Sequence, residues 1–194
     1  MATPDIQLPP RPTALAHTIL SQTLAPGDLA VDATCGNGHD TLHLAQCVGP
    51  GGNVVAIDVQ AAAIEETRHR LATAGIHGDR VRLIHDCHTR IGDHVAAGTA
   101  AAVIFNLGYL PGGDHTLTTT AESTPAALEA AARALRPGGL LMVTCYPGHA
   151  EGAIEAAAVA SWLETSATTR GARVAQYARL FTHRPSPYLW VAAW

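Results

Sequence analysis

Short apolar runs alternate with segments of helical periodicity along most of this chain. Each run holds four or five residues, and a polar residue is its last member or follows directly after it. Such runs are typical of strands that are covered on both faces in a parallel sheet. The runs predict strands at 29–32, 53–57, 81–84, 101–105 and 140–144. Between them, apolar residues recur three or four positions apart, as on one face of a helix. These segments predict helices at 13–24, 41–47, 60–74, 91–97, 125–135 and 150–165.

The alternation of strands and helices predicts an α/β fold in which right-handed crossovers join a mostly parallel sheet. After the last helix, two strands at 174–181 and 188–193 are separated only by a proline-containing loop. A connection this short favours an antiparallel strand at the sheet edge. The sequence therefore predicts a Rossmann-like, seven-stranded sheet with an antiparallel C-terminal edge strand, in a single domain over 1–194. The proline-rich segment 1–12 is expected to be loose.

The first predicted strand leads into a glycine-bearing turn, Val31-Asp-Ala-Thr-Cys-Gly-Asn-Gly-His-Asp-Thr41. Glycines let a ligand approach the main chain, and the helix that begins near His39 offers free N–H groups at its start. Thr41 stands where a dinucleotide loop has its third glycine, and the chain has no lysine for a phosphate-binding P-loop. The turn indicates another nucleotide-like ligand; the alternative is a glycine turn of an unrelated α/β domain.

An acidic residue, Asp32, stands four positions ahead of the first glycine. The arrangement resembles the Asp/Glu-x-Gly-x-Gly-x-Gly motif of class I methyltransferases, with threonine at the first glycine position. A carboxylate suits S-adenosylmethionine, which carries an ammonium and a sulfonium group. The turn thus supplies the first candidates for binding this cofactor: Asp32, Thr34, Gly36, Asn37, Gly38, His39, Asp40 and Thr41.

Polar residues also follow the other predicted strands, and the carboxyl ends of parallel strands meet at one edge of a sheet. Asp58 is expected to accept hydrogen bonds from both ribose hydroxyls, although it could instead cap the helix that follows. Asp86 is expected to accept a hydrogen bond from the adenine amino group. The alternative is that Asp86 only stabilises a turn. Asn106 follows the fourth strand and completes this set of cofactor candidates.

Asn106-Leu-Gly-Tyr109 occupies the place where amino-group methyltransferases carry Asp/Asn-Pro-Pro-Tyr/Phe. Methyl transfer to nitrogen requires a neutral amine whose lone pair faces the sulfonium methyl. The Asn106 carbonyl can accept the amine hydrogens, and Tyr109 can place its ring against the cationic centre. Candidates for taking up a proton from the amine are Asp114, His115 and His149, each with a purely structural role as the alternative.

Composition narrows the classes of protein further. Hydrophobic residues make up 47% and charged residues 14%, as in a globular protein. No apolar run approaches the roughly 18 residues of a membrane span, and the N-terminus lacks the features of a signal peptide, so a cytoplasmic protein is expected. The four cysteines form no C-x-x-C pair, so no metal site is predicted. The net charge of −4 argues mildly against a nucleic-acid partner.

Four stretches together resemble a family of class I methyltransferases labelled "putative rRNA methylase", which is similar to the MnmM tRNA methyltransferases. The resemblance extends from about Ala14 to the C-terminus, and the stretches are Asp32 to Thr41, Ile57-Asp-Val-Gln60, Phe105-Asn-Leu-Gly-Tyr-Leu-Pro-Gly-Gly-Asp114 and Tyr146-Pro-Gly-His-Ala-Glu-Gly152. It adds Gln60 to the cofactor candidates. It implies N-methylation, by S-adenosylmethionine, of the aminomethyl group of 5-aminomethyl-(2-thio)uridine at the tRNA wobble position, and a homodimer.

The resemblance is incomplete before the last strand. Family members often carry an Asn-Gln-x-Asn-x-Pro-Pro-like segment where this chain has Thr182-His-Arg-Pro-Ser-Pro187. A wobble base is unpaired, so a few side chains could hold it by stacking; candidates are Tyr109, Tyr146, His149 and Arg184. Three other functions stay open: methylation of ribosomal RNA, methylation of a small-molecule amine, and non-catalytic binding of an adenosine-type ligand.

Overall fold

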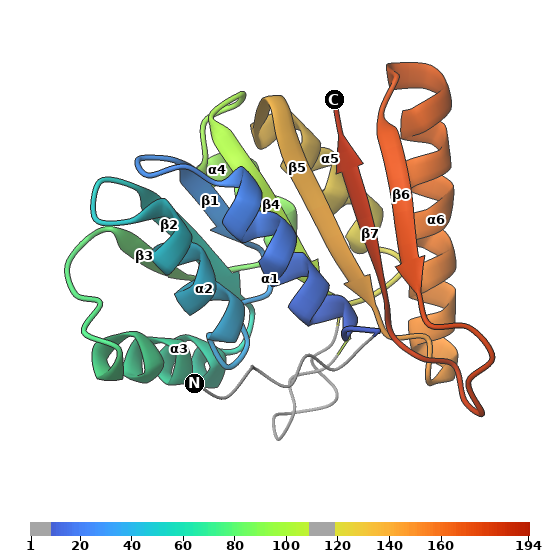
Figure 1. Ribbon diagram of the computed structural model, residues 1–194, viewed down its shortest axis with the longest axis horizontal. Helices are drawn as coiled ribbons and strands as arrows, with labels where there is room; N and C mark the ends of the chain where they lie inside the picture. Colours follow the sequence, from blue (N-terminus) through green and yellow to red (C-terminus); the bar gives the residue numbers. More distant parts are fainter. Residues whose placement is uncertain (1–8, 109–118) are drawn as a thin grey trace, which may run out of the picture.

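A single seven-stranded sheet organises the computed structural model, which describes residues 9–108 and 119–194 (Figure 1). The strand order is β3-β2-β1-β4-β5-β7-β6. The strands are β1 (Leu29–Asp32), β2 (Asn53–Asp58), β3 (Val81–His85), β4 (Ala100–Asn106), β5 (Leu135–Cys145), β6 (Arg173–Ala178) and β7 (Tyr188–Ala193). The helices are α1 (Pro12–Thr23), α2 (His39–Val48), α3 (Ala61–Thr73), the 3-10 turn η1 (His88–Arg90), α4 (Ile91–His94), α5 (Thr124–Ala134) and α6 (Ala150–Arg170).

Helices cover both faces of the sheet, which explains why the central strands are apolar at nearly every position. Alternate residues of β4 point to opposite faces: Ala102 and Ile104 join the cluster beneath α1 and α2, whereas Val103 and Phe105 join the cluster beneath α5 and α6. Both clusters are buried. The sheet is therefore the middle of three layers, and the polar residues of β1, β2 and β4 lie at the ends of these strands.

The C-terminal pair of strands gives the sheet its antiparallel part, so the predicted mostly parallel sheet of seven strands with an antiparallel C-terminal strand is confirmed. The edge position predicted for this strand is taken by β6 instead. β7 pairs antiparallel with both β5 and β6 and lies between them, which leaves β6 as the outermost strand. β6 is largely exposed, whereas Leu189 of β7 is fully buried. The more apolar strand takes the inner place because more surface is removed from water there.

Several element boundaries differ from the predicted ones. β5 begins at Leu135 and includes Pro137-Gly-Gly139, although the strand was predicted to begin only at 140. The pairing with β4 shifts register across this stretch, with Ala100 opposite Leu135 and Ala102 opposite Leu140, so the glycines form an irregularity within the strand. α6 continues to Arg170 and ends at Gly171, whose φ of +69° suits a helix end. In place of the helix predicted at 91–97, the 3-10 turn η1 leads into the short helix α4, which already ends at His94.

Parts of the chain for which the sequence made predictions lie outside the described residues. The segment 1–12 lies mostly outside the described residues, although Pro12 already belongs to α1. Within the stretch Phe105 to Asp114 that carries part of the family resemblance, the residues from 109 onward are also outside them. Within the described ranges, no helix has the length and apolar character needed to cross a membrane.

Candidate active site at the carboxyl ends of the strands

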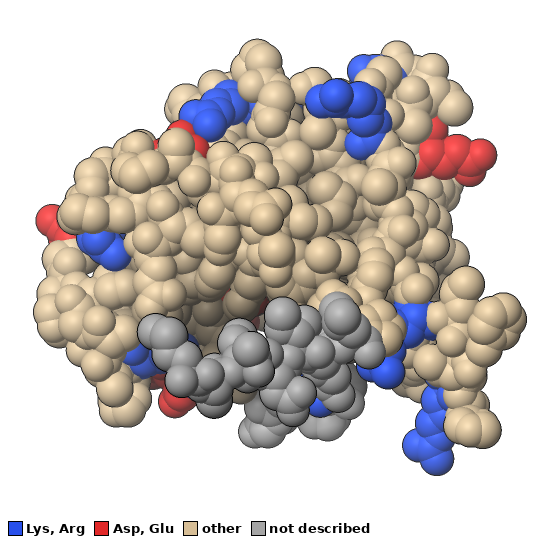
Figure 2. Space-filling view, in the orientation of Figure 1, with Lys and Arg blue, Asp and Glu red and all other residues tan. Residues whose placement is uncertain are grey.

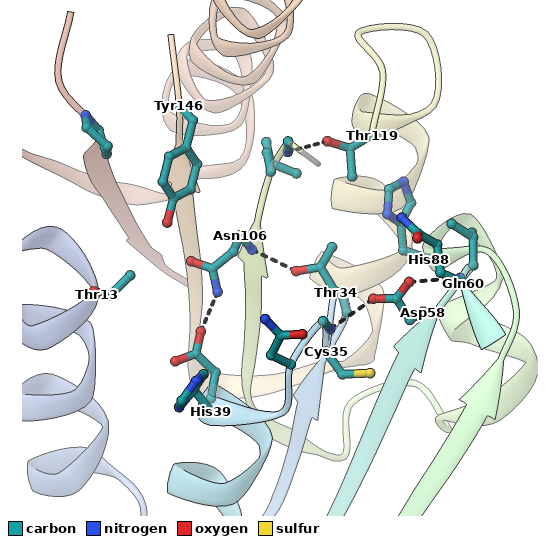
Figure 3. A pocket seen from close by; sticks show the side chains of 18 of the residues that line it. Thr13, Thr34, Cys35, His39, Asp58, Gln60, His88, Asn106, Thr119 and Tyr146 are labelled. Atoms are coloured by element: carbon teal, nitrogen blue, oxygen red, sulfur yellow. Dashed lines mark hydrogen bonds between the residues drawn. The ribbon is translucent and has the colours of Figure 1, made fainter. Parts of the chain in front are cut away.

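A cavity of about 890 Å³ opens at the carboxyl ends of the central strands (Figure 3). It lies where the strand order reverses between β1 and β4, the usual ligand position in such sheets. Its volume falls within the range of about 300–1,000 Å³ that is typical of sites for cofactors and small molecules. Most of the walls come from the turn after β1, the ends of β2 and β4, the segment after β5, and the loop between β6 and β7, and α1 and η1 also contribute.

The structure brings most of the predicted site residues to this cavity. The cofactor candidates that line it are Thr34, Gly36, Asn37, His39, Asp40, Asp58, Gln60 and Asn106. His149, a catalytic candidate, lines it as well. The candidates away from its lining are Asp32, Gly38, Thr41 and Asp86. Tyr109, Asp114 and His115 lie outside the described residues. The roles of all these residues stay predictions.

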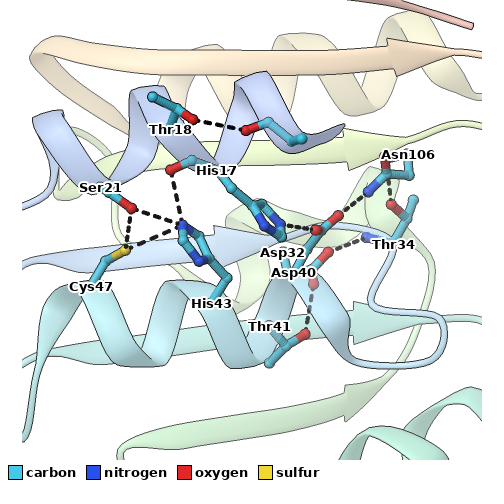
Figure 4. A network of polar contacts seen from close by, with 11 residues as sticks. His17, Thr18, Ser21, Asp32, Thr34, Asp40, Thr41, His43, Cys47 and Asn106 are labelled. Carbon is cyan, nitrogen blue, oxygen red and sulfur yellow. Dashed lines mark hydrogen bonds and ion pairs between the residues drawn. The ribbon is translucent and has the colours of Figure 1, made fainter. Parts of the chain in front are cut away.

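Asp32 lies beneath the glycine turn and is completely buried. Its carboxylate accepts a hydrogen bond from Oγ1 of Thr41 at 2.6 Å and one from the backbone N–H of Thr34 at 3.3 Å (Figure 4). Burial, together with the nearby charge of Asp40, raises the pKa of Asp32 to about 7. Asp32 and Thr41 therefore shape the turn from below.

The two glycines of the turn contribute differently. Gly38 has a φ of +76°, and a Cβ atom there would lie 2.8 Å from Cα of Thr67 in α3. Oγ1 of Thr67 also donates to the carbonyl of Gly36 at 3.1 Å. The absence of a side chain at Gly38 thus allows α3 to pack closely against the turn, whereas Gly36 faces the cavity.

Asp58 makes the structural contact at the start of α3 that the sequence left open as the alternative, and it also lines the cavity. One carboxylate oxygen accepts from the backbone N–H of Gly36 and the other from that of Gln60, each at 2.9 Å. The first bond ties the glycine turn to β2, and the second supports the start of α3. Each oxygen has a further lone pair, and Asp58 lines the cavity, so it can still accept from ligand hydroxyls.

Asp86 is engaged away from the cavity. Its carboxylate accepts from Nε2 of His94 at 2.8 Å and from the backbone N–H of Cys87 at 2.8 Å, and Arg90 lies beside it. The neighbouring His88 lines the cavity instead, buried and packed edge-on against Phe105. Burial lowers the pKa of His88 to about 4, so its imidazole is neutral near pH 7. Its Nε2 has no hydrogen-bond partner among the described residues.

Asn106 is held through its backbone N–H and its side-chain Nδ2, whereas its Oδ1 is left open. Its backbone N–H donates to Oγ1 of Thr34 at 2.8 Å, and its Nδ2 donates to Asp40. Its Oδ1 is buried and finds no partner in the part of the chain that the structure describes. A buried acceptor without a donor costs free energy on the order of 1–3 kcal/mol, so this atom is suited to receive a donor from a ligand.

His149 has a structural contact in addition to its place at the cavity. Its Nδ1 accepts from the backbone N–H of Gly152 at 3.1 Å, which caps the start of α6. The cap is the structural role that the sequence left open as the alternative. Tyr146, three residues earlier, also lines the cavity, and burial raises the pKa of its hydroxyl.

Several residues of the site were missed in the sequence, among them His88, Thr13, His17 and Thr119. Thr13 and His17 reach the cavity from α1, which precedes the glycine turn and carries no motif. Thr119 accepts from the backbone N–H of Gly108 at 2.7 Å and donates to the buried Glu155 at 2.9 Å. This contact clamps the chain just after Asn106. Only the polar, threonine-rich character of the loop hinted at such a role.

The described residues hold no cluster of three or more His, Cys, Asp or Glu side chains arranged to bind a metal ion. The groups that line the cavity are instead main-chain amides, single carboxylates, amides and imidazoles. Such a set suits a hydroxylated, partly cationic organic ligand of the S-adenosylmethionine type.

Known proteins are similar to this chain in sequence. A chloroplastic tRNA (mnm(5)s(2)U34)-methyltransferase from Arabidopsis thaliana is 41% identical over 148 residues, which are 72% of this chain and 54% of that protein. The chain thus spans about half the length of this curated relative. A ribosomal RNA small subunit methyltransferase H from Sinorhizobium fredii is 32% identical over 97 residues, which are 50% of this chain and 27% of that protein.

Two crystal structures are similar over nearly the whole chain. One is described as a "putative rRNA-methylase" from Clostridium thermocellum, with 34% identity, a TM-score of 0.89, and coverage of 95% of this chain and 97% of that one. The other is a "putative methyltransferase" from Streptococcus mutans in complex with SAH, with 34% identity, a TM-score of 0.81, and coverage of 95% and 98%. These neighbours confirm the class I methyltransferase fold. Residues 54–193 match the family described as "Putative rRNA methylase", and this chain belongs to that family.

Proposed function

We propose that this chain is an S-adenosylmethionine-dependent N-methyltransferase that acts on the aminomethyl group of 5-aminomethyl-(2-thio)uridine at the wobble position of tRNA. The observation that carries the proposal is Oδ1 of Asn106, a buried acceptor without a partner among the described residues, in the cavity beside the glycine turn. An amine is a donor of the kind this atom lacks.

The residues along the cavity fit the cofactor. Asp58 retains lone pairs for two ribose hydroxyls, and Gly36 and Asn37 present main chain at the start of α2. The neutral imidazole of His88 and the amide of Gln60 supply further polar groups along the same wall. When bound, S-adenosylmethionine supplies an electrophilic methyl group on a cationic sulfur.

The residues near Asn106 fit the acceptor amine. Accepting one amine hydrogen at Oδ1 would fix the direction of the nitrogen lone pair, and such alignment can supply effective molarities of about 10⁵–10⁸ M. Tyr146 offers an aromatic wall in the same cavity. Because the raised pKa of Tyr146 keeps its hydroxyl protonated, the ring stays uncharged near pH 7.

An RNA substrate is supported by the tRNA-modifying relative from Arabidopsis and by the surface beside the cavity. The loop between β6 and β7 contributes Pro185 and Pro187 to the cavity and exposes Arg179 and Arg184. Figure 2 shows arginine side chains at the lower right of the visible face, over the end of the molecule that holds this loop. A flipped, unpaired base needs few phosphate contacts, which is compatible with a net charge of −4.

A ribosomal RNA substrate is the second candidate. It is favoured by the description of the family and by the similarity to methyltransferase H of the ribosomal small subunit. The homodimer and the cytoplasmic location remain predictions; sedimentation of the purified chain and fractionation of cells that produce it would test them.

The test uses purified protein, labelled S-adenosylmethionine, and tRNA from cells blocked at the 5-aminomethyluridine stage. Digestion to nucleosides and mass analysis are expected to reveal 5-methylaminomethyluridine or its 2-thio form. Ribosomal RNA and small alkyl amines serve as competing substrates. Methylation of ribosomal RNA alone, or of a small amine alone, would contradict the proposal of a tRNA substrate. Cofactor binding without transfer to any of these substrates would contradict the proposed methyltransferase activity.

A further inference from the structure

Three side chains from three separate elements form a line of contacts that ends at the cavity (Figure 4). His17 of α1 contacts one carboxylate oxygen of Asp40 through its Nε2. Asn106, at the end of β4, donates from Nδ2 to the other oxygen of Asp40. Asp40 belongs to the first turn of α2 and so connects the glycine turn with the end of β4.

The chemistry of Asp40 decides which way the amide of Asn106 points. An ionised carboxylate only accepts hydrogen bonds, so the NH₂ group of Asn106 must face it and Oδ1 must face the other way. Burial raises the pKa of Asp40, but hydrogen bonds and charge from His17 and the bond from Asn106 outweigh burial and leave this pKa below its usual value. Asp40 is therefore ionised near neutral pH.

His17 is itself held firmly. Its ring stacks on that of His43, with 4.0 Å between ring centroids and 7° between planes. Nε2 of His43 lies 3.0 Å from the carbonyl oxygen of His17 and 3.2 Å from Oγ of Ser21. These contacts join α1 to α2 and restrict the position from which His17 reaches Asp40.

We propose that Asp40, held by His17, is a positioning residue that fixes the amide of Asn106 so that Oδ1 faces the acceptor amine. The inference rests on the proposed function and deepens it, because it names what orients the group that receives the amine. It also differs from the sequence-based expectation for Asp40, which placed this residue with the cofactor.

The main test is a double-mutant cycle. Asp40→Asn keeps the size of the side chain but adds an NH₂ donor, so the amide of Asn106 is free to turn over. We expect kcat/KM for 5-aminomethyluridine tRNA to fall on the order of 10²-fold, as for other small misplacements of a reacting group. The dissociation constant of S-adenosylmethionine is expected to stay within about threefold, since one hydrogen bond at the cavity wall is altered.

The cycle separates positioning from other roles. In an Asn106→Ala background, Asp40→Asn is expected to lower kcat/KM by less than about threefold, because its target is gone. Full additivity of the two losses, or a loss of cofactor affinity that accounts for the fall, would overturn the proposal. Asp93→Asn is the matched control: Asp93 pairs with Arg90 on the exposed surface and is expected to leave both constants unchanged.

Variants of His17 test the contact between His17 and Asp40. His17→Gln retains an amide donor and is expected to keep most of the activity, whereas His17→Leu is expected to lose at least about tenfold in kcat/KM, consistent with a lost charge-assisted bond. Equal effects of the two variants would contradict a role for this hydrogen bond.

A second measurement does not require activity and separates the two proposals. The ¹⁵N-labelled side-chain amide of Asn106 is expected to shift its NMR resonances in Asp40→Asn but not in Asp93→Asn. Unchanged Asn106 resonances in Asp40→Asn would overturn the positioning role even in an active enzyme. Conversely, the expected shift in a protein that methylates no 5-aminomethyluridine would contradict the proposed function alone.

Discussion

At the scale of single residues, Asn106 is the side chain on which the proposed chemistry depends. It is anchored by Thr34 through the backbone and by Asp40 through Nδ2, and its Oδ1 is left without a described partner. An asparagine placed only for packing would not be expected to leave a buried acceptor open. In the proposed function this open acceptor receives the amine, whereas a site that merely holds an adenosine-type ligand would not depend on it for methyl transfer.

Asn106→Ala tests this distinction. It is expected to lower methyl transfer at least on the order of 10²-fold, because the amine loses the group that aligns it. Binding of S-adenosylmethionine, measured by calorimetry, is expected to remain nearly intact, since Asp58 and the glycine turn are unchanged. If transfer and binding both survive, the assignment of Asn106 is wrong.

At the scale of elements, the irregular start of β5 is tied to the entrance of β1. Arg136 donates to both carboxylate oxygens of Asp28, at 2.6 and 3.1 Å. Asp28 also accepts from the backbone N–H of Ala25 at 2.9 Å and is mostly buried. This fork joins segments more than 100 residues apart in sequence and holds the register shift between β4 and β5 in place.

Asp28→Ala is therefore expected to lower the free energy of unfolding by about 1–3 kcal/mol, the range for losing hydrogen bonds to a charged group. Urea unfolding monitored by circular dichroism measures it. Glu129→Gln is the control, because the pair between Glu129 and Arg170 lies on the surface, and its loss is expected to cost less than about 1 kcal/mol. Equal losses in the two variants would contradict a special role for the Asp28 fork.

The loop between β6 and β7 is the element that differs from the family pattern and also borders the cavity. Phe181 is fully exposed there and has a φ of +57°, which is unusual for a residue other than glycine. Arg184 is exposed in the same loop. A strained loop with exposed aromatic and basic side chains is suited to contact an unpaired nucleic-acid strand.

Arg184→Glu is expected to raise KM for tRNA about 3–10-fold and to make KM less dependent on salt, as for the loss of a phosphate contact. Cofactor affinity should not change. Arg173→Glu is the matched control, since Arg173 is exposed at the opposite end of the same hairpin. An Arg184 variant with unaltered KM would remove this loop from the RNA-binding surface.

At the scale of the whole molecule, two buried groups give the stability opposite dependences on pH. The pKa of Asp32 is raised to about 7, so the folded state holds this proton more tightly than the unfolded chain, and stability falls as pH rises from about 4 to about 7. The pKa of His88 is lowered to about 4, so stability rises between about pH 4 and 6.5. Each contribution is on the order of 3–4 kcal/mol at most.

Single variants are expected to separate the two. Asp32→Asn removes the falling component, so its unfolding free energy should increase more with pH between 4 and 7 than that of the unmodified chain. His88→Asn removes the rising component and should shift the dependence in the opposite sense. Urea unfolding at intervals of half a pH unit measures both slopes. Slopes that do not change in either variant would show that these groups are not the source.

Much of the fold was determined by local sequence. The predicted bounds of β1 and β7 match to the residue, and those of β2, β3 and β4 match to within one residue at each end. Burial on both faces of a parallel sheet leaves a short, continuous apolar signal. β5 instead begins well before its predicted start, and β6 ends before its predicted end. The glycine turn and the polar residues after β2 and β4 predicted which end of the sheet holds the site, since parallel strands end together. The family resemblance followed from these same stretches.

Tertiary packing decided which of several neighbouring polar residues reach the cavity. Asp86 turns to His94, which leaves His88 at the cavity, and no local pattern distinguishes these positions. His17 meets Asp40, and Thr119 meets Glu155, across 23 and 36 residues. Such contacts depend on how α1 and α6 dock on the sheet. Sequence periodicity indicates which face of a helix is buried, but not which polar group lies opposite, because that is set by the packing of distant elements.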